Sequence, residues 1–248
     1  MKDSKLVIIP TYNEAENITD LIPQVMALGG GFEVLVIDDQ SPDGTSALVK
    51  GIQSSYPGRV HLRVREGKQG LGTAYIEGFI YALQRGYEYI FEMDADFSHN
   101  PKDLVRLFNA CSIEGYDMAV GSRYITGVNV VNWPMGRVLM SFFASKYVQF
   151  ITGIPVKDTT AGFICYRARV LGHIDLEKIK FIGYAFQIEM KFTAWKMGFK
   201  VKEVPIIFTD RTKGTSKMSK HIFREAVIGV IYMKLKSLFK PYRKVSQT

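Results

Sequence analysis

Short, continuous apolar runs alternate with longer segments of mixed polarity along the first half of the chain. Runs such as KLVIIP at 5–10 and FEVLVID at 32–38 are apolar at nearly every position, which is typical of strands buried on both faces of a sheet. The mixed segments between such runs are predicted to be helices. Strands are expected at 5–10, 32–38, 60–64, 89–93, 117–121, 162–167 and 201–208, and helices at 14–28, 44–55, 72–85, 101–114, 135–151, 184–197 and 219–239.

This alternation of strands and helices predicts an α/β fold with a doubly wound, mostly parallel central sheet flanked by helices. The ligand-binding loops of such a sheet lie at one edge. The pattern changes after Arg123: residues 124–134 are expected to form a loop, and RTKGTSK at 211–217 is a polar, basic loop. We expect one large domain over 1–218 and a basic, apolar helix or tail over 219–248.

The net charge of +8 refines this picture because it is concentrated near the C-terminal end. From Lys217 onward the chain has eight lysines and arginines and one acid, Glu225, so the remainder is close to neutral. This distribution argues against a broad nucleic-acid surface and for a local basic tail. Cys111 and Cys165 lie in apolar segments at no metal-like spacing, which indicates reduced core residues of a cytosolic protein.

The C-terminal helix contains the apolar run AVIGVIYM at 226–233, which covers eight residues. A membrane-spanning helix needs roughly twenty apolar residues. Neither this run nor the stretch at 138–151 is therefore predicted to cross a bilayer. Two interpretations of 219–239 stay open: an ordinary helix that packs on the domain, or an interfacial helix that lies on anionic lipid or docks a membrane partner.

Two aspartates, Asp94 and Asp96, directly follow the predicted strand at 89–93. They lie at the carboxyl end of a strand, where open α/β sheets bind ligands, and their spacing lets both carboxylates point into one cleft. Such oxygen ligands suit Mg²⁺ or Mn²⁺, which would bridge to a diphosphate. An Asp-x-Asp pair also caps turns and helices in many proteins, so the pair alone leaves both readings open.

Other predicted strand ends carry groups suited to a nucleotide. After the first strand, the ring of Tyr12 is suited to stack on a base, and Glu14 to bond a base edge or a ribose. Asp38 and Asp39, after the second strand, are suited to accept hydrogen bonds from ribose hydroxyls or the base. Acids clustered at three strand ends cost stability unless something compensates them, which favours a nucleotide and metal site over a purely structural cluster.

Known nucleotide and nucleophile motifs do not account for these residues. The glycine-rich loop at 67–72 lacks the third glycine of the dinucleotide-binding pattern and follows the third predicted strand, not the first. The P-loop pattern and the nucleophile elbow are both absent from the sequence. A nicotinamide enzyme is therefore a poor description of this chain.

Several motifs stand in order at consistent spacing: IPTYNE at 9–14, DD at 38–39 with SPDGT at 41–45, GLGTA at 70–74, DAD at 94–96, GSRY at 121–124, DTTAGF at 158–163, and Arg211 with GTSK at 214–217. Over about residues 5–220 the chain thereby resembles the inverting nucleotide-sugar transferases of the GT-A fold, glycosyltransferase family 2. Within them it is similar to the short, single-domain dolichyl- or polyprenyl-phosphate β-mannosyltransferases. The motifs from Gly121 onward are the more specific to that branch.

The resemblance implies a role for each matching residue. Asp94 and Asp96 would serve the metal and the diphosphate, and Ser98 takes the position of a further metal ligand, where serine is weaker than the glutamine of some family members. Arg123 and Arg137 would grip the acceptor phosphate, with Asp96 completing the catalytic set. The nucleotide-sugar site would add Pro10, Tyr12, Glu14 and Asp39, and a loop closing over the donor diphosphate would add Arg211, Ser216 and Lys217.

The activity that the resemblance implies is transfer of mannose from GDP-mannose to the phosphate of dolichyl or polyprenyl phosphate, with inversion and with Mg²⁺ or Mn²⁺ as cofactor. The enzyme would serve protein glycosylation as a peripheral protein on the cytoplasmic face of a membrane. A small membrane subunit is a candidate partner, and nucleic acid is not expected. A phosphate monoester has a second pKa of about 6, so it is largely dianionic at neutral pH and needs little or no general base.

Two other functions are compatible with the same residues. The fold can use another donor, such as UDP-glucose or UDP-N-acetylglucosamine, or a glycan as acceptor. Alternatively, the chain is a non-catalytic nucleotide-sugar-binding or membrane-scaffold protein that has kept the fold. Retention of both the Asp94 and Asp96 pair and the basic loop at 211–217 argues against a non-catalytic protein, because such a protein has no need of both.

Overall fold

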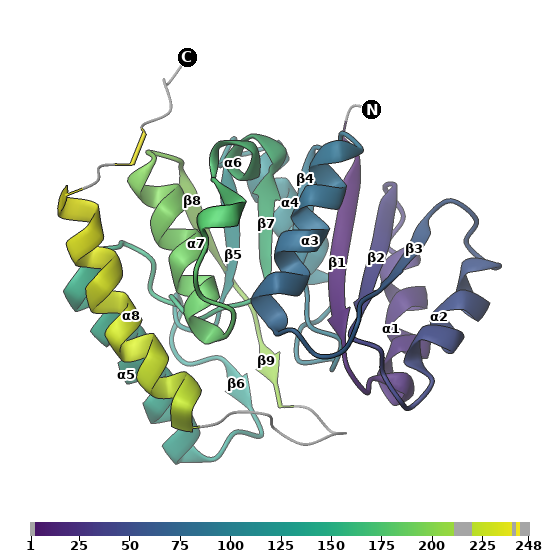
Figure 1. The fold of residues 1–248 in the computed structure, drawn as a ribbon, viewed down its shortest axis with the longest axis horizontal. Coiled ribbons are helices and arrows are strands. Elements are labelled where there is room, and N and C mark those ends of the chain that lie inside the picture. The colour runs from purple at the N-terminus through teal and green to yellow at the C-terminus, as the bar shows by residue number, and fades with distance from the viewer. Residues whose placement is uncertain (1–2, 211–219, 240–241, 244–248) are drawn as a thin grey trace.

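The computed structural model describes residues 3–210, 220–239 and 242–243, and is built on a seven-stranded sheet of order β3-β2-β1-β4-β7-β5-β8 (Figure 1). Its strands are β1 (Lys5–Thr11), β2 (Phe32–Asp38), β3 (Val60–Val64), β4 (Tyr89–Glu92), β5 (Met118–Ser122), β7 (Ile164–Arg167) and β8 (Val201–Pro205). A small second sheet pairs β6 (Val130–Val131) with β9 (Phe208–Thr209). The helices are α1 (Ala15–Met26), α2 (Thr45–Gln53), α3 (Leu71–Gln84), α4 (Asp103–Ser112), α5 (Met135–Thr152), α6 (Ala168–His173), α7 (Tyr184–Lys196) and α8 (Lys220–Phe239), with a 3₁₀ helix at Leu176–Lys178.

The large sheet is parallel except at β7, which runs antiparallel to both β4 and β5. Its register places Thr11 opposite Asp38 and Ile8 opposite Glu92, so the chain leaves β1, β2 and β4 at the same edge. The expected α/β fold with a mostly parallel sheet is confirmed. The predicted ligand loops meet at this carboxyl edge, as they do in other open α/β sheets.

Helices cover both faces of the sheet (Figure 1). Leu6 and Ile8 pack with residues of α3, α6 and α7 in one buried cluster, whereas Val7 and Ile9 pack with residues of α1, α2 and α4 in another. Because successive side chains of a strand point to opposite faces, a strand covered on both sides is apolar at consecutive positions. This accounts for the continuous apolar run at the start of the chain.

α5 and α8 lie side by side at one end of the sheet, next to α7 (Figure 1). The three helices form a third buried cluster, which contains Val148, Ile188, Phe192, Val230 and Met233. One face of α8 therefore packs on the domain, as the first interpretation of 219–239 expected. Within the described residues, none of the helices is both long enough and apolar enough to cross a membrane.

Most predicted elements are confirmed with small shifts at their ends. The predicted strand at 201–208 is wrong as a single element, because β8 ends at Pro205 and β9 begins at Phe208. The segment at 124–134, expected to be a loop, contains β6, which pairs with β9. The pattern also fails to predict α6 and the 3₁₀ helix. Cys111 and Cys165 are buried, as expected for core residues.

Candidate active site

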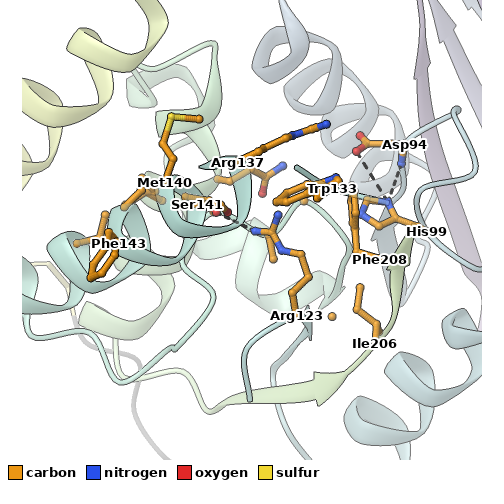
Figure 2. A pocket seen from close by; sticks show the side chains of 18 of the residues that line it. Asp94, His99, Arg123, Trp133, Arg137, Met140, Ser141, Phe143, Ile206 and Phe208 are labelled. Carbon is orange, nitrogen blue, oxygen red and sulfur yellow. Dashed lines mark hydrogen bonds and ion pairs between the residues drawn. The ribbon is translucent and has the colours of Figure 1, made fainter. Parts of the chain in front are cut away.

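A cavity of about 510 Å³ opens where the carboxyl edge of the sheet meets α5 and α8. Its lining changes from charged to apolar along its length (Figure 2). Among the labelled side chains, Asp94 and His99 lie toward one end and Met140 and Phe143 toward the other, with Trp133, Arg123 and Arg137 between them. The structure thus brings four of the predicted site residues together, since Asp94, Asp96, Arg123 and Arg137 all line this cavity.

Asp94 and Asp96 lie on the turn that follows β4, and the carboxylate of each accepts a hydrogen bond from another residue of the protein. The buried hydroxyl of Tyr75, on α3, donates to Oδ1 of Asp94 at 3.5 Å, while 37% of the Asp94 side chain stays exposed. Oδ1 of Asp96 accepts the main-chain N–H of Ser98 at 3.1 Å. The turn-forming role therefore holds for Asp96, and both carboxylates still face the cavity.

His99 is a residue of this site that the sequence analysis did not single out. It is buried, and its ring stacks on Phe163 with centroids 4.7 Å apart. Burial lowers the pKa of His99 to about 4, so the imidazole is neutral at pH 7. Its Nδ1 accepts the main-chain N–H of Asp94 at 3.3 Å, which fixes the first residue of the turn.

The oxygen donors at the end of β4 fit a divalent cation. Ser98 is buried, and its hydroxyl has no hydrogen-bond partner among the described residues. Within that same part of the chain, no group of three or more His, Cys, Asp or Glu side chains is arranged to hold an ion. Asp94 and Asp96 would therefore supply two ligands, with substrate phosphate and water supplying the others, which is the usual coordination of Mg²⁺. A direct role for Ser98 stays a prediction.

The acids at the end of β2 have partners within the protein. Asp38 is fully buried and accepts hydrogen bonds from the Thr11 hydroxyl at 2.8 Å and from the main-chain N–H of Ser41 at 2.9 Å. Asp39 accepts from Nε of Arg65 at 2.7 Å. Arg65 is thus a counter-ion for Asp39, and Thr11 and Ser41 supply hydrogen bonds to Asp38, so both acids have structural partners that the sequence pattern did not reveal.

The predicted nucleotide residues at the end of β1 are not among those that line the cavity. Pro10, Tyr12 and Glu14 are half-buried at the end of β1. The ring of Tyr12 lies 5.0 Å from Nζ of Lys68, which belongs to the glycine-rich loop. That loop is tied to the end of β2, because Arg65 donates to the carbonyl of Gly70 at 3.3 Å as well as to Asp39. Their role in nucleotide binding stays a prediction.

Arg123, at the end of β5, is held by a buried ion pair. Its Nε and Nη2 donate to the two carboxylate oxygens of Asp158 at 2.7 and 2.6 Å, and Nη2 also donates to the hydroxyl of Thr160 at 2.9 Å. Burial raises the pKa of Asp158, but the charge and hydrogen bonds of Arg123 outweigh it and hold that pKa below its usual value. The ion pair anchors the segment at 158–162, part of which lines the cavity.

Arg137, near the start of α5, is more exposed than Arg123. It donates to Asp210 at 2.8 Å, and about 29% of its side chain is exposed. Its guanidinium lies over the ring of Trp133, with Cζ 4.2 Å from the ring centroid. Asp210 directly precedes the predicted donor loop, whose residues Arg211, Ser216 and Lys217 lie outside the described residues.

A buried polar network lies behind the cavity and was not expected from the sequence. Burial raises the pKa of Glu92 to about 7, and its carboxylate accepts from the Tyr166 hydroxyl and from Gln187, which lines the cavity. Burial lowers the pKa of Lys191, on α7, to about 8. Its Nζ donates to the carbonyl of Ala161 at 2.6 Å. Lys191 therefore supports, from behind, the segment that Asp158 anchors.

The far end of the cavity is apolar and lies between helices. Its wall consists of Met140, Phe143, Ala144, Tyr147 and Val148 of α5, Ile188 of α7, and Val227 and Val230 of α8. The outer surfaces of α5 and α8 are apolar as well. Exposed apolar side chains there are Met135, Leu139, Phe143, Phe150, Ile228, Ile231, Leu235, Leu238 and Phe239. An apolar passage between two helices thus opens beside an apolar surface.

Residues 6–175 match the model of a protein family described as glycosyl transferase family 2. A polyprenol monophosphomannose synthase of Mycolicibacterium smegmatis is 47% identical over 225 residues, which cover 91% of this chain and 84% of that protein. An undecaprenyl-phosphate mannosyltransferase of Micrococcus luteus is 43% identical over 225 residues, which cover 91% of each. The similarity therefore extends over most of the chain.

Solved structures of more distant proteins share the fold. A glucosyl-3-phosphoglycerate synthase from Mycobacterium tuberculosis, in complex with Mn²⁺, UDP-glucose and phosphoglyceric acid, superposes with a TM-score of 0.69 at 16% identity, over 94% of this chain and 80% of that one. A structure of the same synthase with Mg²⁺ and UDP gives a TM-score of 0.67 at 16% identity, over 99% and 82% of the two chains. These similarities concern the fold alone.

Proposed function

Because the chain belongs to glycosyl transferase family 2 and is a glycosyltransferase of the GT-A fold, we propose that it transfers mannose from GDP-mannose to the phosphate of polyprenyl phosphate. The transfer inverts the anomeric carbon and depends on Mg²⁺ or Mn²⁺. One observation carries the proposal: a single cavity runs from Asp94 and Asp96, past Arg123 and Arg137, to an apolar passage between α5 and α8. The two relatives, a polyprenol monophosphomannose synthase and an undecaprenyl-phosphate mannosyltransferase, support it.

The two ends of the cavity suit the two parts of a lipid phosphate. Its apolar wall, formed by residues such as Phe143, Val148 and Val230, offers a water-excluding path for the first units of an isoprenoid chain. The guanidinium of Arg137, which lines the same cavity, suits the phosphate. A soluble glycan acceptor would need polar groups along its whole length, and the passage between α5 and α8 supplies few.

The arginines contribute in different ways. Arg123 is already paired with Asp158 and Thr160, so it acts mainly by fixing the segment at 158–162 and by contributing positive charge to the cavity. Arg137 is more exposed, and a phosphate dianion competes for it with the single carboxylate of Asp210. We therefore assign the main contact with the acceptor phosphate to Arg137.

The chemistry of a phosphate acceptor matches the groups that face the cavity. A phosphate monoester is largely dianionic at neutral pH, so its attack on the sugar requires positioning more than proton removal. His99 is suited to a positioning role, since its Nδ1 holds the main chain of Asp94. Asp94 and Asp96 would hold a divalent cation that, when bound, stabilises the charge of the leaving diphosphate.

Contact with a membrane follows from the acceptor. The exposed side chains of Phe143 and Phe150, 61% and 88% accessible, stand on α5, and Leu238 and Phe239 are exposed on the neighbouring α8. Lysines at both helices, such as Lys146, add attraction to anionic lipid. We propose peripheral binding to the cytoplasmic face of a membrane through these two helices. A small membrane subunit is a further candidate partner for the same surface.

The test is transfer of radiolabelled mannose from GDP-mannose into organic-extractable polyprenyl phosphate by the purified chain, with and without EDTA. Metal-dependent label in the lipid phase is the expected result. Competition by unlabelled UDP-glucose or UDP-N-acetylglucosamine measures donor choice. If GDP-mannose neither binds nor reacts while another nucleotide sugar does, the mannose assignment is wrong. If no nucleotide sugar binds, the enzyme assignment at this site is wrong.

A further inference from the structure

Trp133 occupies the middle of the cavity, between the two arginines. Its ring centroid lies 4.2 Å from Cζ of Arg137 and 5.5 Å from Cζ of Arg123, and Phe208 packs against it with centroids 5.2 Å apart (Figure 2). A guanidinium near an aromatic ring is attracted to it, particularly where water is excluded. Trp133 therefore helps to place the cationic groups that face the ligand.

The indole N–H of Trp133 has an unusual environment. Its Nε1 atom is buried, and it has no hydrogen-bond partner among the described residues. Buried N–H donors are nearly always paired, because an unpaired donor has lost its water without replacement. Since Trp133 lines the cavity, the missing acceptor is expected to belong to a ligand. Two neighbouring guanidinium groups make an anionic oxygen the favoured acceptor.

We propose that the indole N–H of Trp133 donates a hydrogen bond to the phosphate of the lipid acceptor, as a third donor beside Arg123 and Arg137. The assignment rests on the proposed function insofar as it takes the ligand to be an isoprenyl phosphate. The position of Trp133 in the cavity favours the acceptor phosphate over the donor diphosphate as its hydrogen-bond partner. Trp133 lies two residues before α5, whose residues Met140 and Phe143 form the apolar passage, whereas Asp94 and Asp96 stand at the other end.

The substitution Trp133→Phe isolates the N–H, because phenylalanine keeps an aromatic ring beside Arg137 and removes the donor. Trp195→Phe is the matched control: it makes the same chemical change on α7, at the other tryptophan of the chain, outside the cavity lining. Thermal unfolding of both variants checks that the fold is intact. The control also leaves Trp133 as the sole tryptophan, so its fluorescence reports ligand binding directly.

The decisive measurement is binding of farnesyl phosphate and of farnesol, which lacks the phosphate, by calorimetry. A hydrogen bond to a charged group is worth about 10- to 100-fold in affinity. We expect Trp133→Phe to lower the affinity for farnesyl phosphate by that factor. The affinities for farnesol and for GDP-mannose should stay unchanged. Trp195→Phe should bind all three ligands as the parent protein does, with a change in Trp133 emission on addition of farnesyl phosphate.

The other outcomes overturn the assignment in distinguishable ways. If the parent and Trp133→Phe bind farnesyl phosphate with equal affinity, the proposed hydrogen bond does not form. Equal losses for farnesyl phosphate and farnesol show that the ring acts by packing alone, and a loss confined to GDP-mannose shows that the N–H serves the donor. Because binding is measured without mannose transfer, failure of the transfer assay rejects the proposed function, while the binding result still decides the role of Trp133.

Discussion

Replacing Arg123 with alanine tests whether its ion pair with Asp158 supports the fold as well as the site. Asp158 is fully buried and receives two side-chain hydrogen bonds from Arg123, at 2.7 and 2.6 Å. Removal of one partner of a buried ion pair typically costs about 3–5 kcal/mol, because the other charge stays buried without compensation. Since folded domains are stable by only about 5–15 kcal/mol, we expect a clearly lower urea midpoint for Arg123→Ala.

The loss should depend on pH. In the parent protein the pKa of Asp158 lies below its usual value, so the pair stabilises the fold above the unfolded-state pKa of about 4, and this contribution is lost as the pH falls through the folded-state pKa. In Arg123→Ala, burial without the arginine raises the pKa of Asp158 instead. The folded variant then takes up a proton as the pH is lowered from 7, which relieves the unpaired charge.

Urea unfolding at pH 7, 6 and 5 measures this effect. The difference in unfolding free energy between parent and variant should be largest at pH 7 and should shrink toward pH 5. Equal stabilities at pH 7, or a difference that does not change with pH, would refute the reasoning. The double variant Arg123→Met, Asp158→Asn is the control: it removes both charges, keeps an acceptor for the main-chain N–H of residue 123, and should recover most of the loss.

Three further predictions concern the site and its surface. Asp96→Ala should lower kcat by roughly 100-fold, and EDTA should abolish transfer by the parent until Mg²⁺ or Mn²⁺ is added back; transfer that survives both treatments contradicts the metal role. Arg137→Ala should raise the KM for the lipid acceptor by about 10-fold, whereas Asp210→Asn, which releases Arg137 from its ion pair, should lower that KM; a rise in the second variant shows that Asp210 serves the site directly. Phe150→Ser should weaken binding to anionic liposomes by about 10-fold in sedimentation assays, because burying a phenylalanine in the lipid contributes about 1.5–3 kcal/mol. Ile113→Ser is the control, because Ile113 is also highly exposed, at 77% against 88% for Phe150, but lies just beyond the end of α4; equal losses in both variants argue against a lipid-facing α5.

The local pattern of apolar and polar residues was sufficient to predict the helices and strands that are long or are buried on both faces. The runs at β1 and β2 are apolar at consecutive positions because both faces of these strands are buried. Burial on both faces is therefore visible in the local sequence. β6 and β9 have two residues each and exist because Val130 pairs with Phe208 across 78 positions, so no local periodicity marks them. The same limit applies to α6, a helix of six residues that follows β7 directly.

Counting acids at strand ends overstates the need for a ligand, because compensation comes from residues that are distant in sequence. Asp39 is paired with Arg65, 26 positions away, and Arg123 with Asp158, 35 positions away. Spacing along the chain reveals neither partner. Among the acids at the ends of β1, β2 and β4, those that line the cavity are Asp94 and Asp96. The case for a metal and a diphosphate therefore depends on where a carboxylate faces, which is a property of the folded chain, and the motif acquires its meaning only when the cavity is known.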